Sequence, residues 1–277
     1  MKIPIPEVEE NFDSCEDALE HIVKSCRIIV DKAKKICAQP SVQDIPAYVL
    51  AFIDKVLMET STLISVSRKR QDYNTVCALV RILADNVATL NIVYHRENDE
   101  EKELRHLLYV LDGVSQRYEL LEGHEMKFDG KIPQETYNAL YLQVEGAKNN
   151  AKACIDFCIK NIKEKPMYVA HQQQIDILIE RKNWKYKDWR SPKASYSWKE
   201  LYGMLNINTG DEMFPYLSQY VHGLSVSNIM LDDKDDFDAP VSFATCLIGW
   251  LWYYIRKVYA PHVGPYTVED VIKIMAK

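Results

Sequence analysis

Glycine and proline are scarce in this chain, with nine glycines and eleven prolines among 277 residues. Barrels and sandwiches of short strands need many tight turns, and these two residues dominate such turns. No segment alternates cleanly between apolar and polar residues, and no internal repeat is visible. The shortage therefore disfavours a fold built on β-strands.

The chain also has no excess of basic residues, and its formal net charge is −6. Proteins that bind DNA without sequence preference normally carry a basic surface, so this class is disfavoured, although a local basic site remains compatible. The N-terminal residues MKIPIPEVEENF contain no apolar core after a basic start, and we expect no signal peptide. The odd number of cysteines, seven, is typical of reduced thiols in a cytoplasmic protein.

The familiar catalytic and cofactor motifs are missing. The chain contains no GxxxxGK[ST], GxGxxG, GxSxG or HExxH, which removes support for the common ATPase, dinucleotide, hydrolase and zinc-protease sites. Cys154 and Cys158 lie one helical turn apart, but no CxxC or HxxxH accompanies them. We expect neither a metal ion nor another cofactor.

What the chain does contain is a succession of long helical patterns. Capping residues, first-turn prolines and apolar periodicity predict five of them, at about 14–37, 46–66, 73–94, 104–121 and 133–165. Short connections predict an all-α, up-and-down bundle over residues 1–182. Residues 183–277 have shorter helices and denser aromatics, which indicates a smaller irregular C-terminal subdomain packed on the bundle or continuous with it. The uncharged segment 240–255 is short for a membrane span and is expected to be a core helix, without a membrane partner.

The third pattern, Tyr73 to Tyr94, has only two charged residues, Arg81 and Asp85. A helix that is apolar on nearly every side belongs inside a bundle, and a charge there is almost never left unpaired. The two residues are four apart, so they share one helix face. They either pair with each other or hold a group brought from elsewhere in the chain.

A second candidate is the segment from Arg181 to Lys199, which has seven basic residues and one acidic one. Five aromatic residues, among them Trp184 and Trp189, alternate with basic residues such as Arg190. Cations that neutralise phosphates and rings that stack on bases are what single-stranded nucleic acid binding requires. The alternative is a connecting segment whose tryptophans anchor it to the bundle.

A third candidate is the segment from Phe214 to Asn228. Ser218 and His222 are four apart and would share a helix face, and Gly223 suits the end of that helix. His222 is therefore either a structural histidine at a helix end or a general acid/base or phosphate contact.

These motifs together carry a resemblance. RILADNVATLNIVY resembles an R-x-x-x-(E/D) helix, and NW…SWKELYGMLN…YLSQYVHG resembles a W…Y-x-x-LS-x-x-x-HG signature, of a bacterial all-helical family of unknown function. That family is similar to the HEPN bundles of toxins, abortive-infection proteins and RNA-cleaving nucleases. Carried over by position, the resemblance points to six residues: Arg81, Asp85, Trp184, Tyr216, Ser218 and His222. It also implies a homodimer.

One departure from the HEPN pattern favours binding over RNA cleavage. Active HEPN ribonucleases have an arginine four to six residues before the histidine, whereas YLSQYV separates Pro215 from His222 here. We therefore expect binding of RNA or a nucleotide-like phosphate ligand, with Arg81 on phosphate, Asp85 orienting it, and Ser218 and His222 lining the site. The alternatives are a protein-interaction or scaffold module of a defence or toxin system, and a metal-independent ribonuclease with a displaced arginine.

Overall fold

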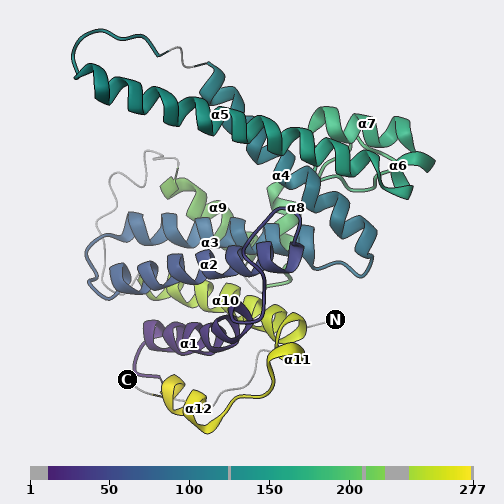
Figure 1. The fold of residues 1–277 in the computed structure, drawn as a ribbon. Helices are drawn as coiled ribbons and strands as arrows, with labels where there is room; N and C mark the ends of the chain where they lie inside the picture. The colour runs from purple at the N-terminus through teal and green to yellow at the C-terminus, as the bar shows by residue number, and fades with distance from the viewer. Residues whose placement is uncertain (1–11, 124–125, 208–209, 222–236, 276–277) are drawn as a thin grey trace. The chain divides into compact units, whose positions relative to one another are not determined.

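The computed structural model describes residues 12–123, 126–207, 210–221 and 237–275 (Figure 1). Within these ranges the chain forms twelve helices and no β-strand. Two isolated β-bridges occur, Ser41 with Asp44 and Tyr186 with Ser195. The all-α class and the helical-bundle architecture predicted from the sequence are confirmed.

The chain forms two compact units. Unit 1 combines Met1–His95 with Ser197–Lys277, and unit 2 is the intervening segment Arg96–Tyr196. The sequence analysis placed a boundary after residue 182 instead. The grouping differs because a long apolar helix near the C-terminus packs with the first helices of the chain.

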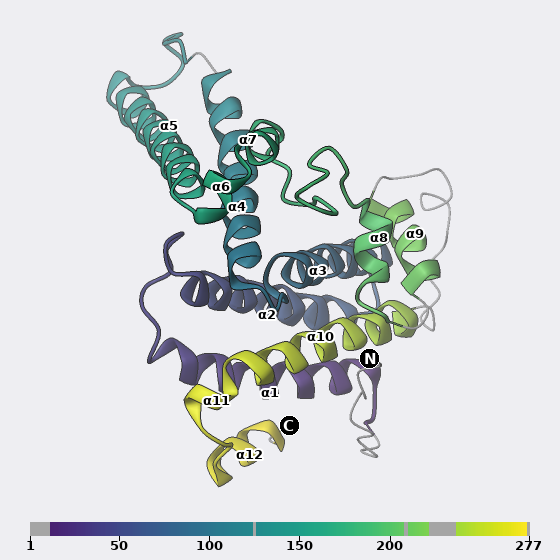
Figure 2. The ribbon, with the colours of Figure 1, turned by 90° about the vertical axis from the view of Figure 1, so that its right-hand side faces the viewer.

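Unit 1 is built on four long helices. Figure 2 shows α1 and α10 side by side, with α2 and α3 above them, and each packs against at least two of the others. α9 and α8 pack on α3, and the short α11 and α12 pack near α1. The helices are α1 (Cys15–Lys34), α2 (Ile45–Ser67), α3 (Tyr73–Tyr94), α8 (Trp198–Gly203), α9 (Gly210–Val221), α10 (Asp238–Val258), α11 (Ala260–Val263) and α12 (Val268–Met275).

The first three helices begin where the sequence provides capping side chains. Ser14, Asp44 and Asp72 each accept a hydrogen bond from a backbone N–H in the first turn of the helix that follows, at 2.9 to 3.2 Å. Such caps satisfy otherwise unpaired donors and contribute about 1 kcal/mol each.

α3 is the central helix of unit 1. By length and composition it is apolar enough to cross a membrane, yet 61% of its most apolar window is buried inside the structure. Leu83 and Val87 are fully buried there, as is Leu57 of α2. Burying one such side chain stabilises the fold by about 1.5–3 kcal/mol. α3 therefore has the burial of a core helix.

A buried carboxylate also ties unit 1 together. Glu16 is only 2% exposed, and it accepts hydrogen bonds from Ser67 Oγ at 2.5 Å and from Arg70 at 3.1 Å. Arg70 also donates to Asp238, at 2.7 Å. The Glu16 carboxylate thus joins the start of α1 to the end of α2 through Ser67. Through Arg70 it is also linked to Asp238 at the start of α10.

Unit 2 is an antiparallel helical hairpin with two short helices, and Figure 1 shows its two long helices lying against each other. Of the 30 residues of α5, only Ala151, Cys158 and Ile162 are buried. The remaining segment, 182–196, has no regular helix. The helices are α4 (Asp99–Glu122), α5 (Gln134–Lys163), α6 (Pro166–Ala170) and α7 (Gln172–Arg181).

Candidate functional site

Arg81 is held by two partners within unit 1. Its Nη1 donates to the carboxylate of Asp85, one turn along α3, so the two charges pair as one of the sequence alternatives proposed. Its Nε donates to Ser218 Oγ on α9, at 3.1 Å. Ser218 Oγ in turn donates to the carbonyl of Phe214, at 2.8 Å. The structure therefore brings three of the predicted site residues together.

Tyr202 completes this group and was missed by the sequence analysis. Its hydroxyl donates to the same Asp85 oxygen, and its ring lies 4.8 Å from the Arg81 guanidinium carbon. Burial, followed by the hydrogen bond to Asp85, raises the pKa of Tyr202. Its position on α8 follows from a capping box between Ser197 and Glu200. Trp198 and Tyr202 are four residues apart, and this spacing was the available sequence signal. In the structure their rings stack, with ring centres 5.8 Å apart.

The four residues Arg81, Asp85, Tyr202 and Ser218 are called the Arg81 cluster below. The Arg81 side chain is 14% exposed and that of Asp85 is 37% exposed, so the cluster lies at the edge of the core. Two guanidinium nitrogens are already bonded inside the cluster. These two bonds fix the direction of the guanidinium.

Tyr216 lies in a neighbouring chain of hydroxyl groups. Its hydroxyl is 2.6 Å from that of Tyr73 and 2.9 Å from that of Tyr220. Burial, followed by the hydrogen bond to Tyr216, raises the pKa of Tyr73. These hydroxyl contacts join the start of α3 to α9.

His222, the predicted acid/base residue, lies outside the described residues. It follows Val221, the last residue of α9, in the sequence. Its relation to Arg81 therefore stays a prediction.

The basic and aromatic segment of unit 2 folds back on itself. Lys187 N–H donates to the carbonyl of Ala194 at 3.0 Å, and Tyr196 N–H donates to that of Lys185 at 2.8 Å. These bonds flank the isolated bridge between residues 186 and 195. We call residues 185–196 the ribbon.

The predicted ligand-binding residues in this region differ in exposure. Trp184 is 6% exposed, its Nε1 donates to Asp112 at 3.1 Å, and its ring meets Tyr109 edge-on. Trp184 thus anchors the segment to α4. Trp189 is partly exposed, and the guanidinium of Arg190 lies 4.4 Å from the centre of its ring.

Arg105 holds the ribbon in place and was not singled out from the sequence. It is 1% exposed, and it donates to the carbonyls of Trp184 and Tyr186 at 2.9 and 3.0 Å. Its guanidinium carbon lies 3.7 Å from the centre of the Tyr186 ring, and its Nε donates to Glu101 at 2.9 Å. The available signal was one arginine within the apolar run LRHLLYVL. The hydroxyl of Tyr186 is buried without a hydrogen-bond partner in the described part of unit 2.

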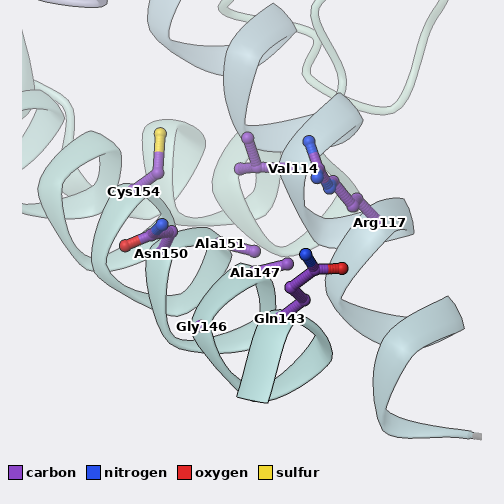
Figure 3. A pocket seen from close by; sticks show the side chains of 8 residues that line it. All are labelled: Val114, Arg117, Gln143, Gly146, Ala147, Asn150, Ala151 and Cys154. Carbon is purple, nitrogen blue, oxygen red and sulfur yellow. The ribbon is translucent and has the colours of Figure 1, made fainter. Parts of the chain in front are cut away.

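Unit 2 also contains a shallow hollow between its two long helices, shown in Figure 3. Its volume is about 460 Å³, and α4 contributes Val114 and Arg117 to its lining. α5 contributes mostly small and amide side chains: Gln143, Gly146, Ala147, Asn150, Ala151 and Cys154.

The candidate residues therefore fall into two groups, each within one unit. The Arg81 cluster and Tyr216 belong to unit 1, whereas Trp184, Trp189 and Arg190 belong to unit 2. Among the described residues, no group of three or more histidine, cysteine or acidic side chains is arranged to hold a metal ion. Comparison of the chain with protein-family models, curated proteins and solved structures finds no match.

Proposed function

We propose that this protein binds single-stranded RNA, or a nucleotide that carries the same phosphate and base groups, through the ribbon of unit 2. The supporting observation is the exposed face of the ribbon. Lys187, Arg190 and Lys193 are exposed there, around the partly exposed rings of Trp189 and Tyr196.

The chemistry of this face suits a flexible, charged strand. The cations neutralise phosphates, and flat rings stack on bases without sequence preference. The Lys187 ammonium lies 5.4 Å from the centre of the Tyr196 ring, and Arg190 lies over Trp189, so cations and rings alternate. Arg105 pre-organises the backbone beneath, which lowers the entropy cost of binding.

The experiment is a titration of a labelled single-stranded RNA, followed by fluorescence anisotropy at several salt concentrations. Trp189→Ala is expected to lose about 1–3 kcal/mol of binding free energy for one stacked base. Arg190→Ala and Lys193→Ala are each expected to lower the slope of log affinity against log salt concentration by about one, which corresponds to the loss of one phosphate contact. Lys131→Ala, at an 84% exposed lysine before α5, is the matched control and leaves binding unchanged. Equal binding by all four variants contradicts the proposal.

Arg81 is proposed as a phosphate contact of unit 1, oriented by Asp85 and Ser218. The support is the fixed guanidinium, whose Nη2 edge is directed by the two bonds on its other nitrogens. Arg81→Lys keeps the charge but removes the fork that grips a phosphate. Calorimetric titration with a nucleoside phosphate is expected to show weaker binding by Arg81→Lys than by the control Lys55→Ala, at a lysine of α2 whose side chain is 61% exposed. Equal affinities would exclude this contact.

In the same proposal, His222 is the general acid/base that would transfer protons if the bound RNA is cleaved. Incubation of the pure protein with RNA in a chelator, with His222→Ala as the control, decides between binding alone and a metal-independent ribonuclease. We expect binding without cleavage, because no arginine lies between Pro215 and His222.

Two further features support the proposed setting. All seven cysteines are free thiols, and burial raises the pKa of Cys158 to about 12, as suits unreactive thiols in a reducing bacterial cytoplasm. The alternative function, a protein-interaction module, is favoured by exposed apolar residues of unit 2, with Leu120 66% and Leu142 70% exposed.

A further inference from the structure

His171 lies at the corner between α6 and α7, and its backbone is fixed on both sides. Its N–H donates to the carbonyls of Met167 and Tyr168, at 3.1 Å each, and its carbonyl accepts from the N–H of Ile175 at 3.1 Å. His171 thus ends α6 and precedes the first turn of α7. The side chain is therefore carried by a helical corner of unit 2.

The His171 ring packs against the ribbon. Its centre lies 4.2 Å from the centre of the Trp189 ring, and the two rings are tilted by 41°. The guanidinium carbon of Arg190 lies 4.4 Å from the centre of the same Trp189 ring. His171 and Trp189 are both partly exposed. The imidazole is therefore at the surface next to the residues proposed to hold the RNA strand.

The imidazole has a hydrogen-bonding capacity that the described part of the chain does not use. Neither ring nitrogen of His171 forms a hydrogen bond with a described residue. When protonated, the ring donates two N–H groups and carries a positive charge. Histidine is also the side chain that ordinarily changes its charge between pH 5 and 8. Two unused donors on a cation match the acceptor oxygens of a phosphate.

The charged groups of the segments around His171 already contact one another. These contacts are Asp176 with the Tyr168 hydroxyl at 3.1 Å, Asp188 with Arg190 at 3.6 Å, Glu164 with Lys160 at 3.8 Å, Lys165 with Glu103, and Lys163 at 6.0 Å from the centre of the Tyr168 ring. No carboxylate of the described residues is bonded to the imidazole. Protonation of His171 therefore adds a positive charge beside Arg190 without a bonded counter-charge.

Arg190 can exchange its partners when a strand binds. Its side chain is 69% exposed, and its ion pair with the 47% exposed Asp188 is equally accessible to water. Such exposed ion pairs contribute little, and an exposed cation–π contact like that with Trp189 contributes only about 0.5–1 kcal/mol. A base can therefore replace the guanidinium on the Trp189 ring while Arg190 turns to a phosphate. His171 is then the second cation beside the stacked base.

We propose that His171, in its protonated form, binds a phosphate of the RNA strand, so that RNA affinity rises as the pH falls. This inference rests on the RNA binding proposed for the ribbon and adds a contact from the corner of α6 and α7. A neighbouring phosphate favours the imidazolium, so the strand and the proton bind together. The added affinity is complete where the free protein already has the imidazolium, and it is lost as the pH rises until the complex releases the proton.

Fluorescence anisotropy of the full chain with a labelled oligouridylate, from about pH 5.5 to about pH 8, tests the proposal. Uracil has no group that titrates in this range. The wild type is expected to bind about three- to tenfold more tightly at the lower pH, where tenfold corresponds to a pKa difference of one unit. His171→Phe keeps a ring against Trp189 but cannot be protonated, so it should lose this gain. His171→Arg is a cation throughout and should bind equally tightly at both ends of the range.

His262→Phe makes the same change at an exposed histidine of α11 and is the matched control, which should keep the wild-type pH dependence. His171→Gln is a second uncharged variant and should behave like His171→Phe, and circular dichroism checks that each variant is folded. A wild-type affinity that does not change with pH overturns the inference, as does a His171→Phe variant with the wild-type pH dependence. If Trp189→Ala still weakens binding in that case, the RNA-binding proposal stands without His171. A wild type that binds no RNA at any pH overturns both.

Discussion

Arg81 Nε donates a hydrogen bond to Ser218 Oγ at 3.1 Å, across 137 positions of sequence. This bond fastens α9 to the central helix of unit 1. We predict that Ser218→Ala lowers the free energy of unfolding by about 1 kcal/mol, the usual loss for one such bond. Arg81→Ala should lose about 1–3 kcal/mol, at the low end because the Asp85 carboxylate is partly solvated. Urea denaturation measures both, and a Ser218→Ala loss larger than that of Arg81→Ala would contradict this account.

The buried carboxylate of Glu16 gives a larger effect. Arg70→Ala removes its cationic partner and leaves the carboxylate with Ser67, so we predict a loss of about 3 kcal/mol or more in the free energy of unfolding. The control is Arg68→Ala two residues earlier, whose partners Asp17 and Glu20 are 41% and 33% exposed. Each of these exposed pairs should contribute less than about 1 kcal/mol. Similar losses for the two variants would show that the burial of Glu16 has no energetic consequence.

Arg105 should determine the rigidity of the ribbon. Arg105→Ala leaves the carbonyls of Trp184 and Tyr186 without their buried donor. We predict faster hydrogen exchange at the amides of Lys187 and Tyr196, whose bonds close the ribbon. Exchange in α3, in unit 1, is the internal reference and should not change. Unchanged protection of the ribbon amides would mean that Arg105 is not its support.

Alkaline pH should destabilise unit 1. Burial raises the pKa of Tyr73, Tyr202 and Tyr254 above the ordinary value of 10.0, so the fold favours their neutral forms. The full stability is present below about pH 10, where tyrosines of the unfolded chain are also neutral. Above it the unfolded chain loses protons that the folded chain keeps, and the free energy of unfolding falls with rising pH.

Urea denaturation from about pH 9 to about pH 11 measures this dependence. Tyr202→Phe removes one of these phenols, and its unfolding free energy should fall less steeply above pH 10 than that of the wild type. Identical slopes would contradict the assigned role of Tyr202.

The sequence predicted the five long helices of the first 165 residues, because capping residues, prolines and apolar periodicity are local signals. It also identified Arg81 and Asp85 as a pair, since two charges in an apolar helix must be compensated. It did not predict the grouping of α10 with α1, α2 and α3. Which apolar faces meet is decided by packing between distant segments, and periodicity carries no information on it.

The contacts of Tyr202 and Arg105 show the same limit at the candidate site. Tyr202 meets Asp85 across 117 positions and Arg105 meets Tyr186 across 81. A single sequence reveals that such a group needs a partner, but not which distant segment supplies it. For the basic segment, composition left open whether the rings are exposed for stacking or anchor the segment. Trp184 is an anchor, because it is buried and bonded to Asp112 in α4.

The central claim is that the ribbon of unit 2 holds single-stranded RNA, and photocrosslinking tests it most directly. A single-stranded RNA containing 4-thiouridine is crosslinked to the full protein, and the attached peptides are identified by mass spectrometry. The account predicts that the main crosslinks fall within residues 185–196, centred on Trp189, and that Trp189→Ala reduces them. Crosslinks spread evenly over the lysines of both units, or absent from the ribbon, would contradict it.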